Sequence, residues 1–249
     1  MKLEQILNDL IKFYLEESSH PIIDIPKNYV NKREFLRALI NVREPKNVPN
    51  EIIEKENELL QYELSEKKLI DINSFDDKIS IWQGDITNVI CDAIVNPTDN
   101  KMIGCMKPNH NCVSNKINTY AGISLRLKCR EITKGQTIEV SKVILTDSFN
   151  LPCKKVIHAV KPEVEDILNE DIKEKIRLFY INSLELARKN KLETICIPNL
   201  SVPSNFKDEV SKICIDSIKN FMNDNNEIKK VLINVYTLED FDIYKNNLK

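Results

Sequence analysis

Short β-rich runs alternate with helical patterns from Lys78 to the end of the chain, and this alternation limits the fold more than any other feature of the sequence. It is typical of a sheet whose faces are covered by helices. The predicted strands are residues 79–82, 91–95, 138–145, 155–160, 194–197 and 230–236. The predicted helices are residues 112–131, 171–189 and 207–222, with a short last helix that holds Phe241 and Tyr244. We therefore expect an α/β fold with one six-stranded sheet.

The first 73 residues carry helical patterns only, and we expect them to form an N-terminal helical extension to a main domain at residues 74–249. The first helix places its apolar side chains on one face. A second helix is predicted to begin at Asn31, which caps it, while Glu34 completes a capping box. The third is predicted at residues 50–69 and has a charged, solvated face. So small and polar a unit is not an independent domain, and we expect it to pack on the main domain.

Charge and hydropathy narrow the classes of partner. The net charge of −2, from 36 basic and 38 acidic residues, gives no electrostatic footprint for nucleic acid or an anionic membrane. There is no run of about 18 apolar residues, and Glu4 and Asp9 stand where a signal peptide needs an apolar segment. Seven cysteines without framework spacing fit reduced thiols. We expect a cytoplasmic protein without nucleic-acid or membrane partners.

Cys105, His110 and Cys112 fall within eight residues and form a candidate metal site. Two thiolates and an imidazole suit zinc, and three protein ligands leave a coordination position open, as in catalytic sites. From spacing alone, metal binding and ordinary packing of small buried thiols are equal alternatives. Pro108 and Asn109 are turn formers, which places the three residues on a loop and favours a ligand role.

The loops around this segment carry a family resemblance. Residues 83–87 (QGDIT) and 92–96 (DAIVN), followed by the Cys-His-Cys segment, closely resemble the zinc-dependent macrodomains of microbial ADP-ribosylation systems. Residues 36–45 (LRALINVREP) and 149–152 (FNLP) are similar to further parts of that family. The resemblance implies a three-layer α/β/α macrodomain with a mixed six-stranded sheet. It also implies an enzyme that binds ADP-ribose and removes it from acidic side chains of a modified protein.

The resemblance assigns roles to individual residues. Asp85 matches the acidic position that accepts a hydrogen bond from the adenine amino group, with the Ile86 backbone beside it. Without the family, Asp85 reads as a turn-forming residue after a strand. Val113 and Ser114 fall at the helix start that faces the ligand, next to Cys112.

The metal cluster takes its role from the same resemblance. Cys105, His110 and Cys112 match three zinc ligands that meet the distal ribose at the scissile bond, where zinc polarises an oxygen or activates water. Asp99 stands where the family has an asparagine that orients the distal ribose, and we count it as a candidate catalytic and ligand-binding residue. A carboxylate accepts from a hydroxyl but cannot donate, and it adds negative charge near an anionic ligand.

The loop after residue 197 departs from the family. The family has a Ser-Thr-Gly-x-x-Gly turn whose N–H groups hold the diphosphate, whereas this chain reads PNLSVP and has no glycine after Gly135. Two prolines remove donors, so we expect weaker diphosphate binding. The residues expected to face the ligand here are Asn199, Leu200, Ser201 and Val202.

These departures leave three functions open. The first is a zinc-dependent hydrolase, and the second is a macrodomain that binds ADP-ribose or a related nucleotide without turnover. The third is an interaction module with structural zinc, for which Asp99 is the candidate fourth ligand. The partners implied by the resemblance are an ADP-ribosylated protein, a lipoylated carrier protein and a sirtuin-like transferase.

The other histidines and thiols have structural interpretations. His158 lies in an apolar strand pattern and reads as a core histidine, while His20 precedes a proline in a predicted turn. Four thiols are predicted to be packing residues on helices or strands: Cys129, Cys153, Cys196 and Cys214.

Overall fold

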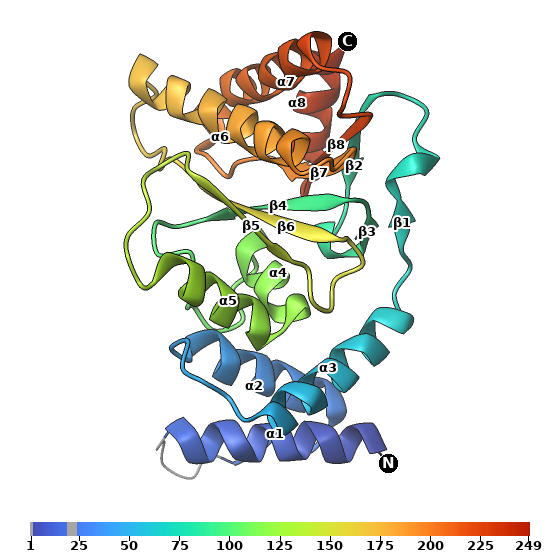
Figure 1. Cartoon of the computed structure of the whole chain (residues 1–249), viewed down its shortest axis with the longest axis vertical. Coiled ribbons are helices and arrows are strands. Elements are labelled where there is room, and N and C mark those ends of the chain that lie inside the picture. Colours follow the sequence, from blue (N-terminus) through green and yellow to red (C-terminus); the bar gives the residue numbers. More distant parts are fainter. Residues whose placement is uncertain (1, 19–23) are drawn as a thin grey trace.

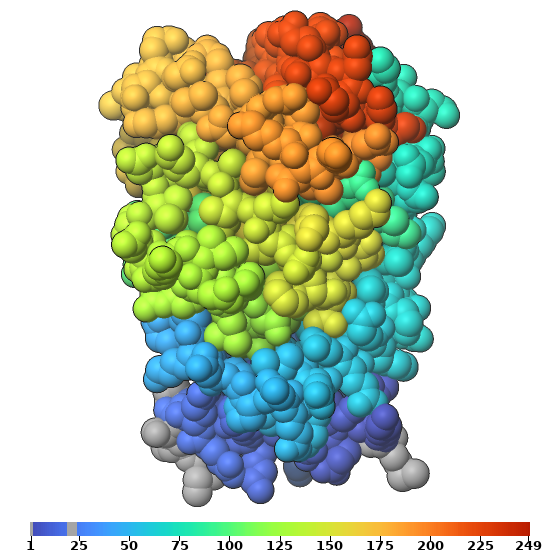
Figure 2. Space-filling view, viewed as in Figure 1, coloured from blue at the N-terminus to red at the C-terminus, as the bar shows by residue number. Residues whose placement is uncertain are grey.

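A computed structural model describes residues 2–18 and 24–249, and helices and a sheet are stacked in layers along its long axis (Figure 1). The N-terminal helices form one end of the molecule, and the other end is formed by α6 (Glu170–Lys189), α7 (Lys207–Asp224) and α8 (Leu238–Leu248) (Figure 2). His20 lies outside the described residues. Within them, no helix is both long and apolar enough to cross a membrane.

The central sheet has six strands in the order β2-β8-β7-β4-β6-β5. Neighbouring strands are parallel except for the edge strand β5, which runs antiparallel to β6. The predicted mixed six-stranded α/β sheet is therefore confirmed. The strand bounds are β2 Ile79–Gln83, β4 Ala93–Thr98, β5 Val143–Asp147, β6 Lys155–Val160, β7 Thr194–Pro198 and β8 Lys230–Val235. A short parallel pair, β1 (Ile70–Asp71) with β3 (Val89–Ile90), lies apart from this sheet.

Successive residues of a strand point to opposite sides of the sheet. Helices cover both sides, so both faces of the sheet are buried. On one face, Ile94 and Val156 pack with Ile117 of α4 (Val113–Ala121) and Leu125 of α5 (Ile123–Thr133). On the other, Val95 packs in a larger core with α6 (Glu170–Lys189) and α7 (Lys207–Asp224). The last helix, α8 (Leu238–Leu248), follows β8 and packs on α7 and β2.

Three predicted elements of the main domain differ most from the structure. Residues 112–131 form two helices rather than one, because Gly122 has φ 91° and a side chain there would crowd Leu60, Asn150 and Glu56. The strand predicted at 138–145 begins only at Val143, since Ser141 has φ 66° and leaves extended geometry. The strand predicted at 91–95 lies at 93–98.

The N-terminal extension is a three-helix unit: α1 Lys2–Ser18, α2 Tyr29–Val42 and α3 Asn50–Ser65. The predicted start of α2 is wrong, because the side chain of Asn28 is the cap and accepts a hydrogen bond from the Asn31 backbone N–H, so Asn31 and Glu34 form no capping box. The third helix ends at Ser65, four residues before the predicted end. Buried side chains of the unit pack with Ile123 at the start of α5, so the unit lies against the main domain.

Candidate functional site

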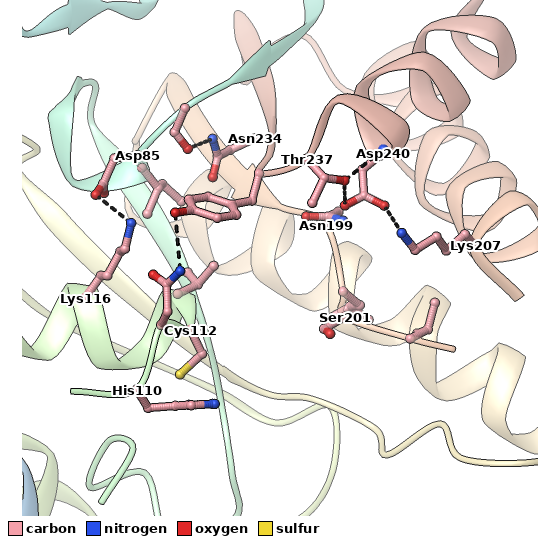
Figure 3. Close-up of a pocket in the computed structure, with 17 residues that line it drawn as sticks. Asp85, His110, Cys112, Lys116, Asn199, Ser201, Lys207, Asn234, Thr237 and Asp240 are labelled. Atoms are coloured by element: carbon pink, nitrogen blue, oxygen red, sulfur yellow. Dashed lines mark hydrogen bonds and ion pairs between the residues drawn. The ribbon is translucent and has the colours of Figure 1, made fainter. Parts of the chain in front are cut away.

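A cavity of about 470 Å³ opens at the carboxyl ends of β2, β7 and β8 and at the N-terminus of α4 (Figure 3). This is the edge where ligands of open parallel sheets bind. Most of the predicted site residues line it: Asp85, Ile86, His110, Cys112, Val113, Asn199, Leu200, Ser201 and Val202. Segments from residue 84 to residue 240 thus meet around one space.

Three predicted residues do not line the cavity. Asp99 is exposed, and its carboxylate accepts hydrogen bonds from the backbone N–H groups of Lys101 (3.0 Å) and Met102 (3.1 Å), so it closes a turn. Ser114 is buried in the first turn of α4. Cys105 does not line it either, but its sulfur lies 3.4 Å from Nδ1 of His110, which does.

The Cys105, His110 and Cys112 side chains converge. One donor atom from each lies within 4.8 Å of the other two. Cys112 is also the N-cap of α4, where its sulfur accepts the Asn115 N–H at 3.4 Å. Burial raises the pKa of Cys112, against the effect of that N–H, so a bound cation is what would favour the thiolate here. Two sulfurs and an imidazole nitrogen form a donor set that fits zinc.

Asp85 follows β2 and caps a single 3₁₀ turn, Ile86–Asn88. Its Oδ1 accepts hydrogen bonds from the N–H (3.0 Å) and hydroxyl (2.7 Å) of Thr87, and its Oδ2 lies 3.1 Å from Lys116 Nζ. Burial alone would raise the pKa of Asp85, but these hydrogen bonds and the lysine charge hold it below its usual value. The carboxylate is therefore ionised and retains acceptor capacity for a ligand amine.

The sequence interpretation missed the residues that β8 and α8 bring to the cavity. Asn234 donates its side-chain N–H to the Gly84 carbonyl oxygen at 3.0 Å. Tyr236 is 52% exposed, and the centre of its ring lies 4.7 Å from Lys116 Nζ. Thr237 and Asp240, at the start of α8, complete this wall. All of these residues lie at or just after the end of the last predicted strand, and that position was the only sequence signal for them. Their place at the cavity depends on the strand order, in which β8 lies between β2 and β7.

The loop after β7 lines the opposite part of the cavity with Asn199, Leu200, Ser201 and Val202. Leu200 is 4% exposed and packs in the core under α7, and the Asn199 N–H donates to the Asn234 carbonyl oxygen at 2.9 Å. Lys207 Nζ lies 2.6 Å from a carboxylate oxygen of Glu239 and 2.9 Å from one of Asp240. Both lysines that line the cavity, Lys116 and Lys207, are thus paired with carboxylates.

The remaining histidine and thiols are structural, as predicted. His158 is 1% exposed and lies 3.0 Å from both Asn96 Nδ2 and Thr146 Oγ1, and burial lowers its pKa to about 3. All four thiols predicted to be packing residues are buried. The placement of Cys153 on a helix or strand was wrong, because it lies in the bend before β6.

Comparisons with known proteins agree with this geometry. Residues 95–205 match the Macro domain family. The chain is 32% identical to a protein-ADP-ribose hydrolase of Staphylococcus aureus (strain MRSA252), covering 98% of this chain and 94% of that protein. It is 30% identical to a protein-ADP-ribose hydrolase of Treponema medium over 94% of this chain and 95% of that one. A solved structure, the Oceanobacillus iheyensis macrodomain with ADP, is 27% identical with a TM-score of 0.60, covering 68% of this chain and 88% of that one.

Proposed function

This chain belongs to the macro domain family, and from that premise we propose that it is a zinc-dependent hydrolase that removes mono-ADP-ribose from acidic side chains of proteins. It is a hydrolase that acts on ADP-ribosylated protein, as its relatives of nearly equal length are named. The observation that carries the zinc proposal is the convergence of three soft donor atoms within 4.8 Å at the cavity wall.

The cavity suggests how ADP-ribose would lie. The Asp85 carboxylate faces it and would accept a hydrogen bond from the adenine amino group. The exposed ring of Tyr236 offers a flat surface on which a base can stack. Ser201 and Val202 would face the diphosphate, and Val113 would lie beside the distal ribose near His110 and Cys112.

The catalytic step would take place beside the metal loop, residues 105–112. Cys105, His110 and Cys112 would hold zinc, which would supply the Lewis acidity that polarises an oxygen or activates water. The chain's own part is to hold the ADP-ribose at Asp85 and at the start of α4, so that the scissile bond comes to the metal ligands. Asp99, whose carboxylate closes an exposed turn, takes no part in this proposed arrangement.

The second candidate function is binding of ADP-ribose without turnover. The loop after β7 favours it, because Leu200 occupies the core and prolines flank the segment. A purely structural zinc has less support, because among the described residues the metal-type cluster contains three members and Asp99 is not one of them.

The identity of the modified protein rests on the sequence resemblance alone. We propose a lipoylated carrier protein as the target and a sirtuin-like transferase as the enzyme that attaches ADP-ribose to it. Release of ADP-ribose from that carrier, compared with release from an unrelated modified protein, tests the assignment. Equal rates on both would contradict it.

The test of the main proposal is release of ADP-ribose from a protein mono-ADP-ribosylated on Asp or Glu. Zinc-loaded protein is expected to release it, and Cys105→Ser is expected to lose both zinc and release. No release by protein that demonstrably holds zinc would overturn hydrolysis of that linkage. Calorimetry with free ADP-ribose would then decide whether the binding function remains.

A further inference from the structure

Two side chains of α2, in the N-terminal unit, contact the backbone of the metal loop, residues 105–112. Arg37 donates from Nη2 to the His110 carbonyl oxygen at 3.1 Å. Asn41 accepts at Oδ1 the backbone N–H of Asn109 at 3.1 Å. These contacts join a helix about 70 residues earlier in the chain to His110 and to its preceding residue.

A third side chain ties the loop to α2 and to α4 at once. Asn115 is 0% exposed and donates from Nδ2 to Asn41 Oδ1 and to the Lys107 carbonyl oxygen, both at 3.0 Å. Its Oδ1 accepts from Arg37 Nη2 at 2.8 Å. Because Asn41 is only 1% exposed, water does not compete well for these bonds, and a missing partner would leave a costly unpaired group.

The end of α2 is itself held in place from the main domain. Arg126 on α5 is 2% exposed, and its Nη1 donates to the carbonyl oxygens of Ile40 (2.8 Å), Asn41 (3.1 Å) and Arg43 (2.9 Å). A cation at a helix C-terminus is favoured because it meets carbonyls that have no partner within the helix. Arg37 and Asn41 therefore start from a backbone that is fixed relative to α5.

The metal loop needs such support because its own backbone is irregular. Asn109 has φ 50°, and Met102, just before the loop, has φ 54°; both are left-handed conformations for residues with a side chain. If the loop adopted this shape only when a metal binds, the entropy cost of ordering it would weaken its affinity for the metal.

We propose that Arg37 and Asn41 are positioning residues that hold the metal loop in its ligand-binding shape, so that the N-terminal helical unit is part of the metal site. This inference rests on the proposed zinc site but not on hydrolysis. Outer partners of metal ligands alter metal affinity by about 10–100-fold in other proteins. Here Arg37 donates to the backbone carbonyl oxygen of the proposed metal ligand His110 rather than to its ring.

The experiment compares Arg37→Ala with Arg33→Ala in the full-length protein. Arg33 lies one turn earlier on α2 and is paired with Glu63 of α3 at 2.5 Å, so its removal loosens the same unit without touching the loop. Zinc affinity is measured by competition with a chromophoric chelator, and folding by thermal unfolding. Arg37→Ala is expected to weaken zinc binding about tenfold or more, and Arg33→Ala less than about twofold. Arg37→Lys, which keeps one charged donor, is expected to fall between Arg37→Ala and wild type.

Equal zinc affinities in Arg37→Ala and wild type, or equal losses in both alanine variants, would overturn the positioning role. Wild-type protein that binds no zinc would overturn the metal site together with this role. Wild-type protein that binds zinc without releasing ADP-ribose would overturn the hydrolase alone, and the affinity comparison would still decide the role of Arg37.

Discussion

The two ends of the cavity are built in different ways. At the metal end, Arg37 and Asn41 hold the loop through polar contacts that cross from α2 to α4. At the other end, the loop after β7 is held by burial of Leu200 and by the prolines at its two ends. The polar contacts fix the place of individual atoms, whereas apolar burial fixes only a volume. Atom positions are thus more tightly fixed at the metal end, where we propose that hydrolysis takes place, than at the loop after β7.

Removal of the proposed zinc is the change with the largest expected effect, because it acts on the end where we propose that hydrolysis takes place. Treatment with a chelator is expected to reduce ADP-ribose release by about a thousandfold. Release is followed by the free nucleotide, and zinc content by elemental analysis. Added zinc should restore release while added magnesium should not, and full release from zinc-free protein would contradict the prediction.

Leu200→Gly tests whether the other end is held by burial. We expect it to lower the free energy of unfolding by about 3–5 kcal/mol, because it removes a core side chain and adds backbone freedom. Urea unfolding measures the change. The control is Ser201→Gly, which adds the same freedom at an exposed neighbour and is expected to cost about 1 kcal/mol or less. Equal stabilities of the two variants would show that Leu200 is not a core residue.

Asp85→Asn tests the contact with the base. The variant lacks the charge that would attract the adenine amine, and we expect it to weaken ADP-ribose binding about tenfold, as for a hydrogen bond to a charged group. Calorimetry with free ADP-ribose measures the affinity. Asp99→Asn is the matched control, because Asp99 lies outside the cavity and its replacement should leave binding unchanged. A stronger effect of the control would reverse the two assignments.

Glu56→Gln tests whether a buried carboxyl group on α3 makes the stability of the protein depend on pH. Glu56 is 3% exposed and accepts the Ile123 N–H at 2.9 Å, and burial raises its pKa from 4.5 to about 7. The folded state thus keeps a proton that the unfolded state has lost between these pH values, so the contribution of Glu56 to stability is full below pH 4.5 and is lost as pH rises through 7. The variant should show a shallower fall between pH 5 and 8 in urea unfolding, because each tenfold difference in proton affinity between the two states is worth about 1.4 kcal/mol. An unchanged slope would assign the pH dependence to other groups.

Much of the fold was predictable because its strands are short apolar runs. Residues 155–160 form β6 as predicted, and β8 ends one residue before its predicted end. The break at Gly122 was missed because apolar residues continue at helical spacing on both sides of it. Asn28 and Asn31 are both good caps, and only the backbone decides between them.

The site was predictable where its residues are close in sequence. The Cys105 to Cys112 segment and Asp85 could be found from spacing and family resemblance. Lys116 and Tyr236 were missed because their approach to Asp85 depends on strand order and helix direction, which no local pattern records. The contacts of Arg37 with the metal loop were missed for the same reason.

The contacts of Arg126 have a consequence for how this protein can be shortened. A fragment that begins at residue 74 would keep this always-charged side chain and lose all three carbonyl oxygens that it meets. It would also expose the apolar surface around Ile123. We therefore expect such a fragment to aggregate. The N-terminal unit and the main domain are therefore expected to depend on each other for stability.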